Sequence, residues 1–116
     1  MRTDLLRVAD ALAAIQKIEE YAERGREEFD DNELIQVWFL YHLAIIGEAM
    51  RAMSSEFQSA HSTINWQGWT GLRNIVVHQY FRVRPTRIWD TVDRDLPGLK
   101  RYLLSIPKYA SDGSVG

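Results

Sequence analysis

The chain has 116 residues and a mass of 13.5 kDa, which suits one domain with one core. Its 46% hydrophobic and 26% charged residues, with only seven Gly and three Pro, exclude collagen-like and low-complexity classes. The absence of cysteine excludes disulfides, Cys-bound metal sites and thiol catalysis. No apolar run approaches the roughly 18 residues of a membrane span, and residues 1–10 lack the apolar centre of a signal peptide. We therefore expect a cytoplasmic protein with no membrane contact.

Charge is distributed unevenly, although the chain as a whole carries only −2. Residues 1–56 carry a net charge of −6, whereas residues 73–101 carry +4. The basic segment suits a phosphate-binding surface. On charge alone, an electrostatic seam between two copies of the chain or a solvated helix surface is the favoured interpretation.

The first expected helix precedes Gly25, and its apolar residues are spaced at helical steps. They form one stripe that should face the core: Leu5, Val8, Leu12, Ile15 and Ala22. Gly25 and the acidic stretch at residues 27–31 are expected to interrupt helical structure.

The second expected helix covers about residues 33–53 and is capped by Asp31 or Asn32. Its apolar residues cover nearly every side, so it is either the central helix or has one face against another chain. Gly47 is expected to permit close packing. Glu48 follows in this apolar context, and a buried carboxylate there would need a partner.

The rest of the chain predicts two more long helices. Residues 54–65 form a polar loop with at most a short helical turn, and Asn65 can cap a third helix that ends before Arg84. A fourth helix begins near Pro85 or Thr86, and Pro97 should kink it or split it. We predict an all-α, up-and-down bundle of four or five helices over residues 1–109, followed by a disordered tail at 110–116.

The side chains best suited to catalysis lie together in the segment from Arg73 to Tyr80. Arg presents a charged donor fork that fits phosphate, and His exchanges protons near neutral pH. Together they can cleave RNA without metal, with the ribose 2′-OH as nucleophile. Arg73 and His78 lie 140° apart around a straight helix, so they share a site only if the helix loosens or if two copies of the chain assemble it.

Other interpretations of these residues remain open at this point. Arg73 could neutralise Glu48, and His78 could interact only with the helix dipole. The chain could then be a non-catalytic module that binds nucleotide or RNA, or the residues could merely staple a dimer. We expect His42 to be a core or interface histidine, and find no partner for His61. The three His lack metal-binding spacing, so no metal or other cofactor is expected.

The four tryptophans are expected in the core rather than as stacking platforms for bases, because each falls on an apolar stripe. They are Trp38, Trp66, Trp69 and Trp89.

Several motifs together resemble one family. Arg73, His78 and Tyr80 match the R-x-x-x-x-H-x-Y signature of the HepT-like group of HEPN-domain proteins, and Asn74 fits the polar residue after the Arg. The stretch Ala44–Ala49 is similar to the A-I-x-x-I-G-E-A-like element of the family's second helix. The resemblance extends over residues 2–106. It also includes Trp66 and Trp69 before the Arg, Tyr80-Phe81, Trp89 and Asp95-Leu96-Pro97.

The resemblance implies a specific function. HepT-like proteins are toxins of two-gene toxin–antitoxin modules, and they act as metal-independent endoribonucleases in homodimers whose cleft lies between protomers. The antitoxin is a minimal nucleotidyltransferase that can transfer AMP to the motif tyrosine, and we expect a homodimer or a larger hetero-oligomer of toxin and antitoxin. Carried over, Arg73 and His78 are catalytic and Tyr80 is the modified residue. Asn74 and Glu48 support them; that Glu48 holds Arg73 is our inference. The alternative is a helical nucleotide- or RNA-binding module, or a non-catalytic partner of a nucleotidyltransferase.

Overall fold

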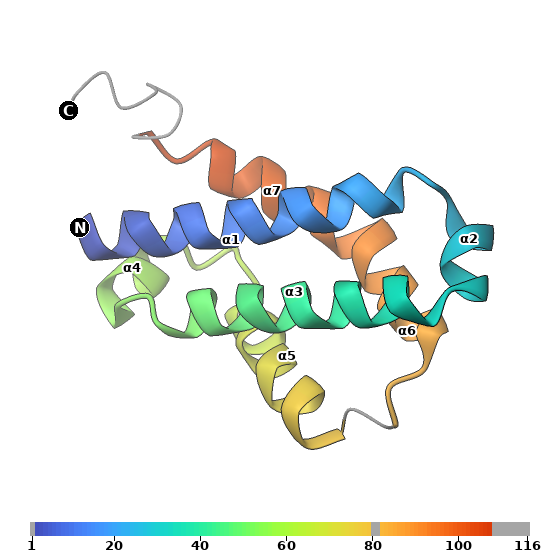
Figure 1. The fold of residues 1–116 in the computed structure, drawn as a ribbon. Coiled ribbons are helices and arrows are strands. Elements are labelled where there is room, and N and C mark those ends of the chain that lie inside the picture. Colours follow the sequence, from blue (N-terminus) through green and yellow to red (C-terminus); the bar gives the residue numbers. More distant parts are fainter. Residues whose placement is uncertain (1, 80–81, 108–116) are drawn as a thin grey trace.

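Every regular element of the described residues, 2–79 and 82–107, is helical in the computed structural model (Figure 1). The elements are α1 (Arg2–Ala22), α2 (Arg26–Asp31), α3 (Glu33–Arg51), α4 (Ser55–Ala60), α5 (Trp66–Gln79), α6 (Pro85–Asp90), the π-helical turn η2 (Thr91–Asp95) and α7 (Leu96–Leu104). The predicted all-α class is therefore confirmed. The expected boundary at residue 109 and the tail at 110–116 lie outside the described residues.

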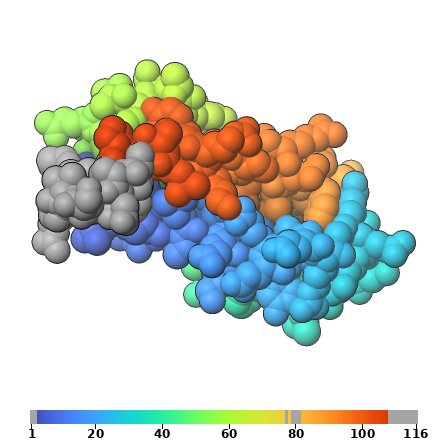
Figure 2. Space-filling view, turned by 90° about the horizontal axis from the view of Figure 1, so that it is seen from above, coloured from blue at the N-terminus to red at the C-terminus, as the bar shows by residue number. Residues whose placement is uncertain are grey.

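Four long helical stretches make up most of this structure. Helices α1 and α3 run antiparallel and pack against each other, and α5 crosses α3 obliquely (Figure 1). The stretch α6–η2–α7 returns so that α7 lies alongside α1 (Figure 2). The C-terminal half of α5 points away from α1 and α7 (Figure 1). The end of α5 that carries the motif is thus presented at the periphery.

The core-facing stripe of α1 is turned slightly from the predicted one. Val8 and Ile15 are fully buried as expected, but Leu5 and Leu12 are only partly buried. Ile18 takes the innermost place in the last turns. The predicted stripe runs from Ile15 to Ala22 in one step of seven residues and therefore leaves out Ile18.

The acidic stretch at residues 27–31 does not interrupt helical structure, because it forms α2. Phe29 anchors this short helix, because it is only 1% exposed. The centre of its ring lies 5.0 Å from the ring centre of Phe39 and 5.3 Å from that of Trp89. One buried aromatic among exposed charges gives no periodic signal, which is why the helix escaped prediction.

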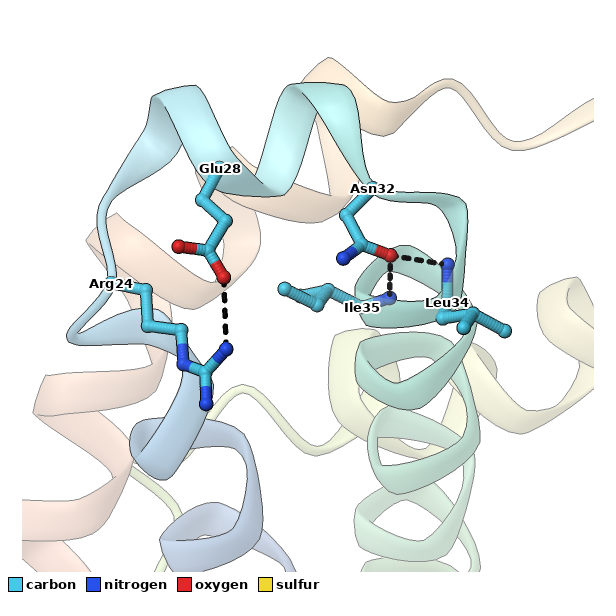
Figure 3. A network of polar contacts seen from close by, with 5 residues as sticks. All are labelled: Arg24, Glu28, Asn32, Leu34 and Ile35. Atoms are coloured by element: carbon cyan, nitrogen blue, oxygen red, sulfur yellow. Dashed lines mark hydrogen bonds and ion pairs between the residues drawn. The ribbon is translucent and has the colours of Figure 1, made fainter.

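A polar network fixes the corner between α1 and α3 (Figure 3). Asn32 caps α3 as predicted, because its Oδ1 accepts hydrogen bonds from the backbone N–H groups of Leu34 at 2.9 Å and Ile35 at 3.3 Å. Across the corner Arg24 donates to Glu28 at 2.9 Å, and this hydrogen bond raises the pKa of the exposed Arg24.

Gly47 permits the close crossing of α3 and α5, as expected. A Cβ at this position would lie 2.9 Å from the carbonyl oxygen of Trp69 and 3.0 Å from the backbone nitrogen of Arg73. Real Cβ atoms do not approach backbone so closely. The glycine therefore sets the distance between the two helices and places the backbone of Arg73 directly on α3.

The chain remains helical through Pro97 rather than splitting there. The backbone widens into η2 just before the proline, which cannot donate an N–H to the preceding turn, and α7 continues from Leu96. The predicted start of this fourth helical stretch at Pro85 is confirmed.

The expectation that α3 is covered on nearly every side is only partly correct. One face of α3 is buried, but Leu34 is 80% exposed, Tyr41 60% and Val37 36%. These three residues form an apolar face that nothing in the described chain covers; we call it the α3 outer face. Separately, no helix of the described ranges is both long and apolar enough to cross a membrane.

Candidate functional site

Arg73 lies in the middle of α5 where that helix crosses α3. Its Nε lies 3.2 Å from Oε1 of Glu48, and its Nη1 donates a hydrogen bond of 3.3 Å to Oδ1 of Asn74. The Arg73 side chain is 38% exposed. The guanidinium is thus held on two sides and still reaches solvent, as an anion-binding arginine must.

One carboxylate oxygen of Glu48 forms ion pairs with two arginines. Besides Arg73, the Nη1 of Arg51 lies 3.8 Å from the same Oε1. The Glu48 side chain is 57% exposed, so the expectation of a buried carboxylate was wrong. Glu48 occupies the edge of α3 rather than its core face. Because such pairs add little to stability, its contact with Arg73 chiefly fixes the orientation of the guanidinium.

His78 and Asn74 lie four residues apart on the exposed side of α5. Both side chains are exposed. His78 is in the last turn of the helix. The imidazole is therefore open to a ligand approaching from outside the chain.

The structure does not bring Arg73 and His78 together within one chain. Helix α5 stays regular from Trp66 to Gln79, so the loosening that would align them does not occur. Arg73 is directed to Glu48 on α3, while His78 lies about 140° around the helix. Of the predicted set, Arg73, Asn74 and Glu48 form one cluster and His78 stands apart. Tyr80 lies outside the described residues.

The two other histidines have structural partners. His42 is 6% exposed and its Nδ1 lies 2.9 Å from the carbonyl oxygen of Trp38, which confirms a core histidine. His61, for which the sequence offered no partner, has its Nδ1 2.8 Å from the Tyr102 hydroxyl. Within the described residues, neither ring forms a hydrogen bond with Arg73, Asn74 or Glu48. Within residues 2–79 and 82–107, no group of three or more His, Asp or Glu is arranged to hold a metal ion.

The tryptophans pack against the core, as expected. Trp69 is 8% exposed, and the other three are partly buried. The indole N–H of Trp38 donates to the Lys17 carbonyl and that of Trp66 to the His61 carbonyl, each at 2.9 Å. These rings serve packing, not base stacking.

A cleft of about 470 Å³ lies between the first half of α5 and the η2–α7 stretch. We call it the α5–α7 cleft. Its lining includes Asn65, Arg87, Arg94, Gly98 and Tyr102. Sequence reasoning placed Arg87 and Arg94 in a basic segment but did not identify the cleft, because its walls come from segments that are distant along the chain.

Comparison with known proteins gives one family. The family described as "Ribonuclease HepT-like" matches residues 11–106. The match includes α5 with Arg73 and His78, and α3 with Glu48.

Individual relatives carry related names. A protein of Thermococcus cleftensis named "Probable ribonuclease HepT" is 35% identical over 78% of this chain and 84% of its own length. A Caldanaerobacter subterraneus subsp. tengcongensis protein named a "Putative RNase" is 32% identical over 69% of this chain and 71% of its own.

A longer relative combines two names. The Methanocaldococcus jannaschii protein named "Gamma-glutamylcyclotransferase and putative RNase" is 31% identical over 82% of this chain, but this match covers only 43% of that protein. No solved structure matches the chain.

Proposed function

Because this chain belongs to the HepT-like ribonuclease family, we propose that it is a metal-independent endoribonuclease and the toxin of a toxin–antitoxin module. One observation carries the proposal. Arg73 is oriented by Glu48 and Asn74 but remains solvent-accessible on the same helix as an exposed His78.

The proposed reaction uses the RNA itself as nucleophile. His78 removes the proton from a ribose 2′-OH, the oxygen attacks the adjacent phosphorus, and the bond to the 5′-oxygen of the next nucleotide breaks. A second imidazole or water returns a proton to that leaving oxygen. The guanidinium of Arg73 stabilises the charge on the non-bridging phosphoryl oxygens. The products are a 2′,3′-cyclic phosphate and a free 5′-hydroxyl.

The separation of Arg73 and His78 supports a site shared by two protomers. In a symmetric dimer each residue occurs twice, so Arg73 of one copy can face His78 of the other. The α3 outer face supports the same arrangement, because exposed Leu34 and Tyr41 would gain from burial against a second copy. The proposed active form is therefore a homodimer.

The reaction is tested with purified protein, labelled RNA and EDTA. We expect the wild-type protein to cut RNA and leave 2′,3′-cyclic phosphate ends. His78→Ala should lower the rate roughly 10²- to 10⁴-fold, the usual contribution of a general acid–base. Gln67→Ala, which changes another exposed residue of α5, serves as the control and should cut normally. Metal-dependent cutting, or an undiminished rate in His78→Ala, would refute the mechanism.

We further propose that a nucleotidyltransferase antitoxin neutralises the protein by transferring AMP to Tyr80. The added phosphate would repel an RNA strand beside Arg73 and His78 and would occupy its space. Co-expression with the neighbouring gene product should raise the intact mass by one or more AMP units. Tyr80→Phe should remove the increase and keep the nuclease active. A mass increase that survives Tyr80→Phe places the modification on another residue.

A further inference from the structure

The α5–α7 cleft combines two cations with neutral hydrogen-bonding groups. Arg87 in α6 and Arg94 in η2 both line it, together with Asn65 and with Tyr102, whose hydroxyl lies 2.8 Å from Nδ1 of His61. One carboxylate, Asp95, also lines the cleft, so guanidinium groups outnumber carboxylates there. This set of donors suits a phosphate better than a metal ion or an apolar ligand.

Neither arginine of the cleft is neutralised by a residue of the described ranges. Both Arg87 and Arg94 are exposed, and neither forms an ion pair with any residue in the described ranges, Asp95 included. By contrast Lys100, on the same basic segment, is tied to Glu19 of α1 at 2.9 Å. Two unpaired guanidiniums bordering one hollow produce a local positive potential that attracts anions.

The cleft is separate from the Arg73–His78 region but reachable along the same helix. Its α5 wall is formed by Gly68, Trp69 and Leu72, whereas Arg73 is turned to α3. From Leu72 to His78 the helix rises by about 9 Å and the two residues lie about 120° apart around it, and from Asn65 to His78 the rise is about 20 Å. A strand of a few nucleotides can therefore extend from the cleft to the cleavage position.

We propose that the α5–α7 cleft binds a phosphodiester segment of the RNA away from the cleaved bond, with Arg87 and Arg94 holding its phosphates. The proposal rests on the ribonuclease function above. An RNA strand suits the cleft better than a free nucleotide, because Arg87 and Arg94 are exposed, whereas small-molecule sites enclose most of the ligand. An RNA strand can lie across a cleft that is open to solvent, because the cleft does not need to enclose it.

Gly98 offers a way to test charge in the cleft without touching either arginine. It lines the cleft from α7, and an added Cβ would meet only Nη2 of Arg101, at 3.9 Å. Gly98→Glu and Gly98→Gln therefore introduce side chains of equal size that differ in charge. Both also remove a glycine from a helix interior, so neither is expected to unfold α7.

Binding is measured with a 2′-O-methyl single-stranded oligonucleotide, which lacks the nucleophilic hydroxyl and cannot be cut by the proposed reaction. We expect Arg87→Gln/Arg94→Gln to weaken binding on the order of tenfold near 0.1 M salt and to lower the slope of log K against log salt by about 1.4. Arg84→Gln/Arg101→Gln removes two exposed charges of the same basic segment outside the cleft lining and should have a smaller effect. Gly98→Glu should bind more weakly than Gly98→Gln.

The outcomes separate the cleft from the nuclease itself. If the wild type binds and cuts RNA but the cleft variants bind like their controls, the cleft proposal is wrong and the nuclease proposal stands. If the wild type binds the oligonucleotide, the cleft variants lose binding and no RNA is cut with EDTA present, the nuclease proposal is wrong and the cleft remains a nucleic-acid site. Equal binding of Gly98→Glu and Gly98→Gln also overturns the cleft proposal.

Discussion

Arg73 is placed by three neighbours with different roles. Gly47 lets the backbone of Arg73 lie against α3. Glu48 forms an ion pair with the Nε of Arg73, and Asn74 accepts a hydrogen bond from its Nη1. The contact with Glu48 joins exposed side chains and contributes at most about 1 kcal/mol to stability. Its chief effect is therefore on where the guanidinium points, which is the property that a phosphoryl-stabilising group depends on.

Glu48→Gln tests this orienting role. Gln keeps the size of Glu but loses the charge that holds Arg73, so we expect kcat to fall on the order of tenfold while KM and the melting temperature change little. Arg51→Gln removes the other partner of Glu48 and should leave kcat nearly unchanged. Steady-state cleavage kinetics check both. A kcat of Glu48→Gln equal to wild type would show that Arg73 needs no such support.

The crossing of α3 and α5 is the contact between elements that positions the site. The two helices touch at Gly47, where the backbone of α5 leaves no room for a side chain. Separating them by even a few tenths of an ångström would move Arg73 relative to Glu48, because the two residues sit on opposite sides of this contact.

Gly47→Ala should consequently destabilise the protein by about 1–3 kcal/mol, the usual effect of overpacking. Gly71→Ala is the matched control: a Cβ there meets nothing within 4 Å, so removing a glycine from α5 should stabilise by up to about 1 kcal/mol. Denaturant unfolding followed by circular dichroism measures both. Equal stability of the two variants would mean that the helices can separate freely at Gly47.

Sequence patterns predicted the helices whose buried apolar residues recur at helical spacing. They missed the features that depend on contacts between distant parts of the chain. The long helices carry apolar stripes, and the caps at Asn32 and Asn65 follow local rules. Asp4 carries no such signal. It is 2% exposed because Ser54, fifty residues away, donates to it from both its N–H and its hydroxyl. The α5–α7 cleft was missed for the same reason, since its walls meet only in the folded chain.

At the site, sequence and family resemblance predicted a set of residues but not how the fold places them. Arg73, Asn74 and Glu48 meet as expected, although Glu48 is exposed. The apolar pattern of α3 could not distinguish a face covered by this chain from one left for another molecule. The structure makes that distinction, since Phe39 is fully buried and Leu34 is 80% exposed.

At the scale of the whole molecule, two features support the proposed homodimer. The α3 outer face is apolar and uncovered in the described chain, and Arg73 and His78 diverge around a regular helix. Pairing two copies would bury the α3 outer face and would let Arg73 of one copy meet His78 of the other. We therefore propose that each active site takes Arg73 from one protomer and His78 from the other.

Mixing two inactive variants tests this claim most directly. Arg73→Ala and His78→Ala should each be nearly inactive alone. Unfolded and refolded together, they should regain about one quarter of the wild-type rate, because about half of randomly paired dimers are mixed and each mixed dimer has one complete site. Adding Leu34→Glu/Tyr41→Glu to both chains should abolish the recovery, whereas adding Leu6→Glu, at an exposed leucine of α1, should not. A mixture that forms mixed dimers by mass yet cuts RNA no faster than its two components would contradict the shared site.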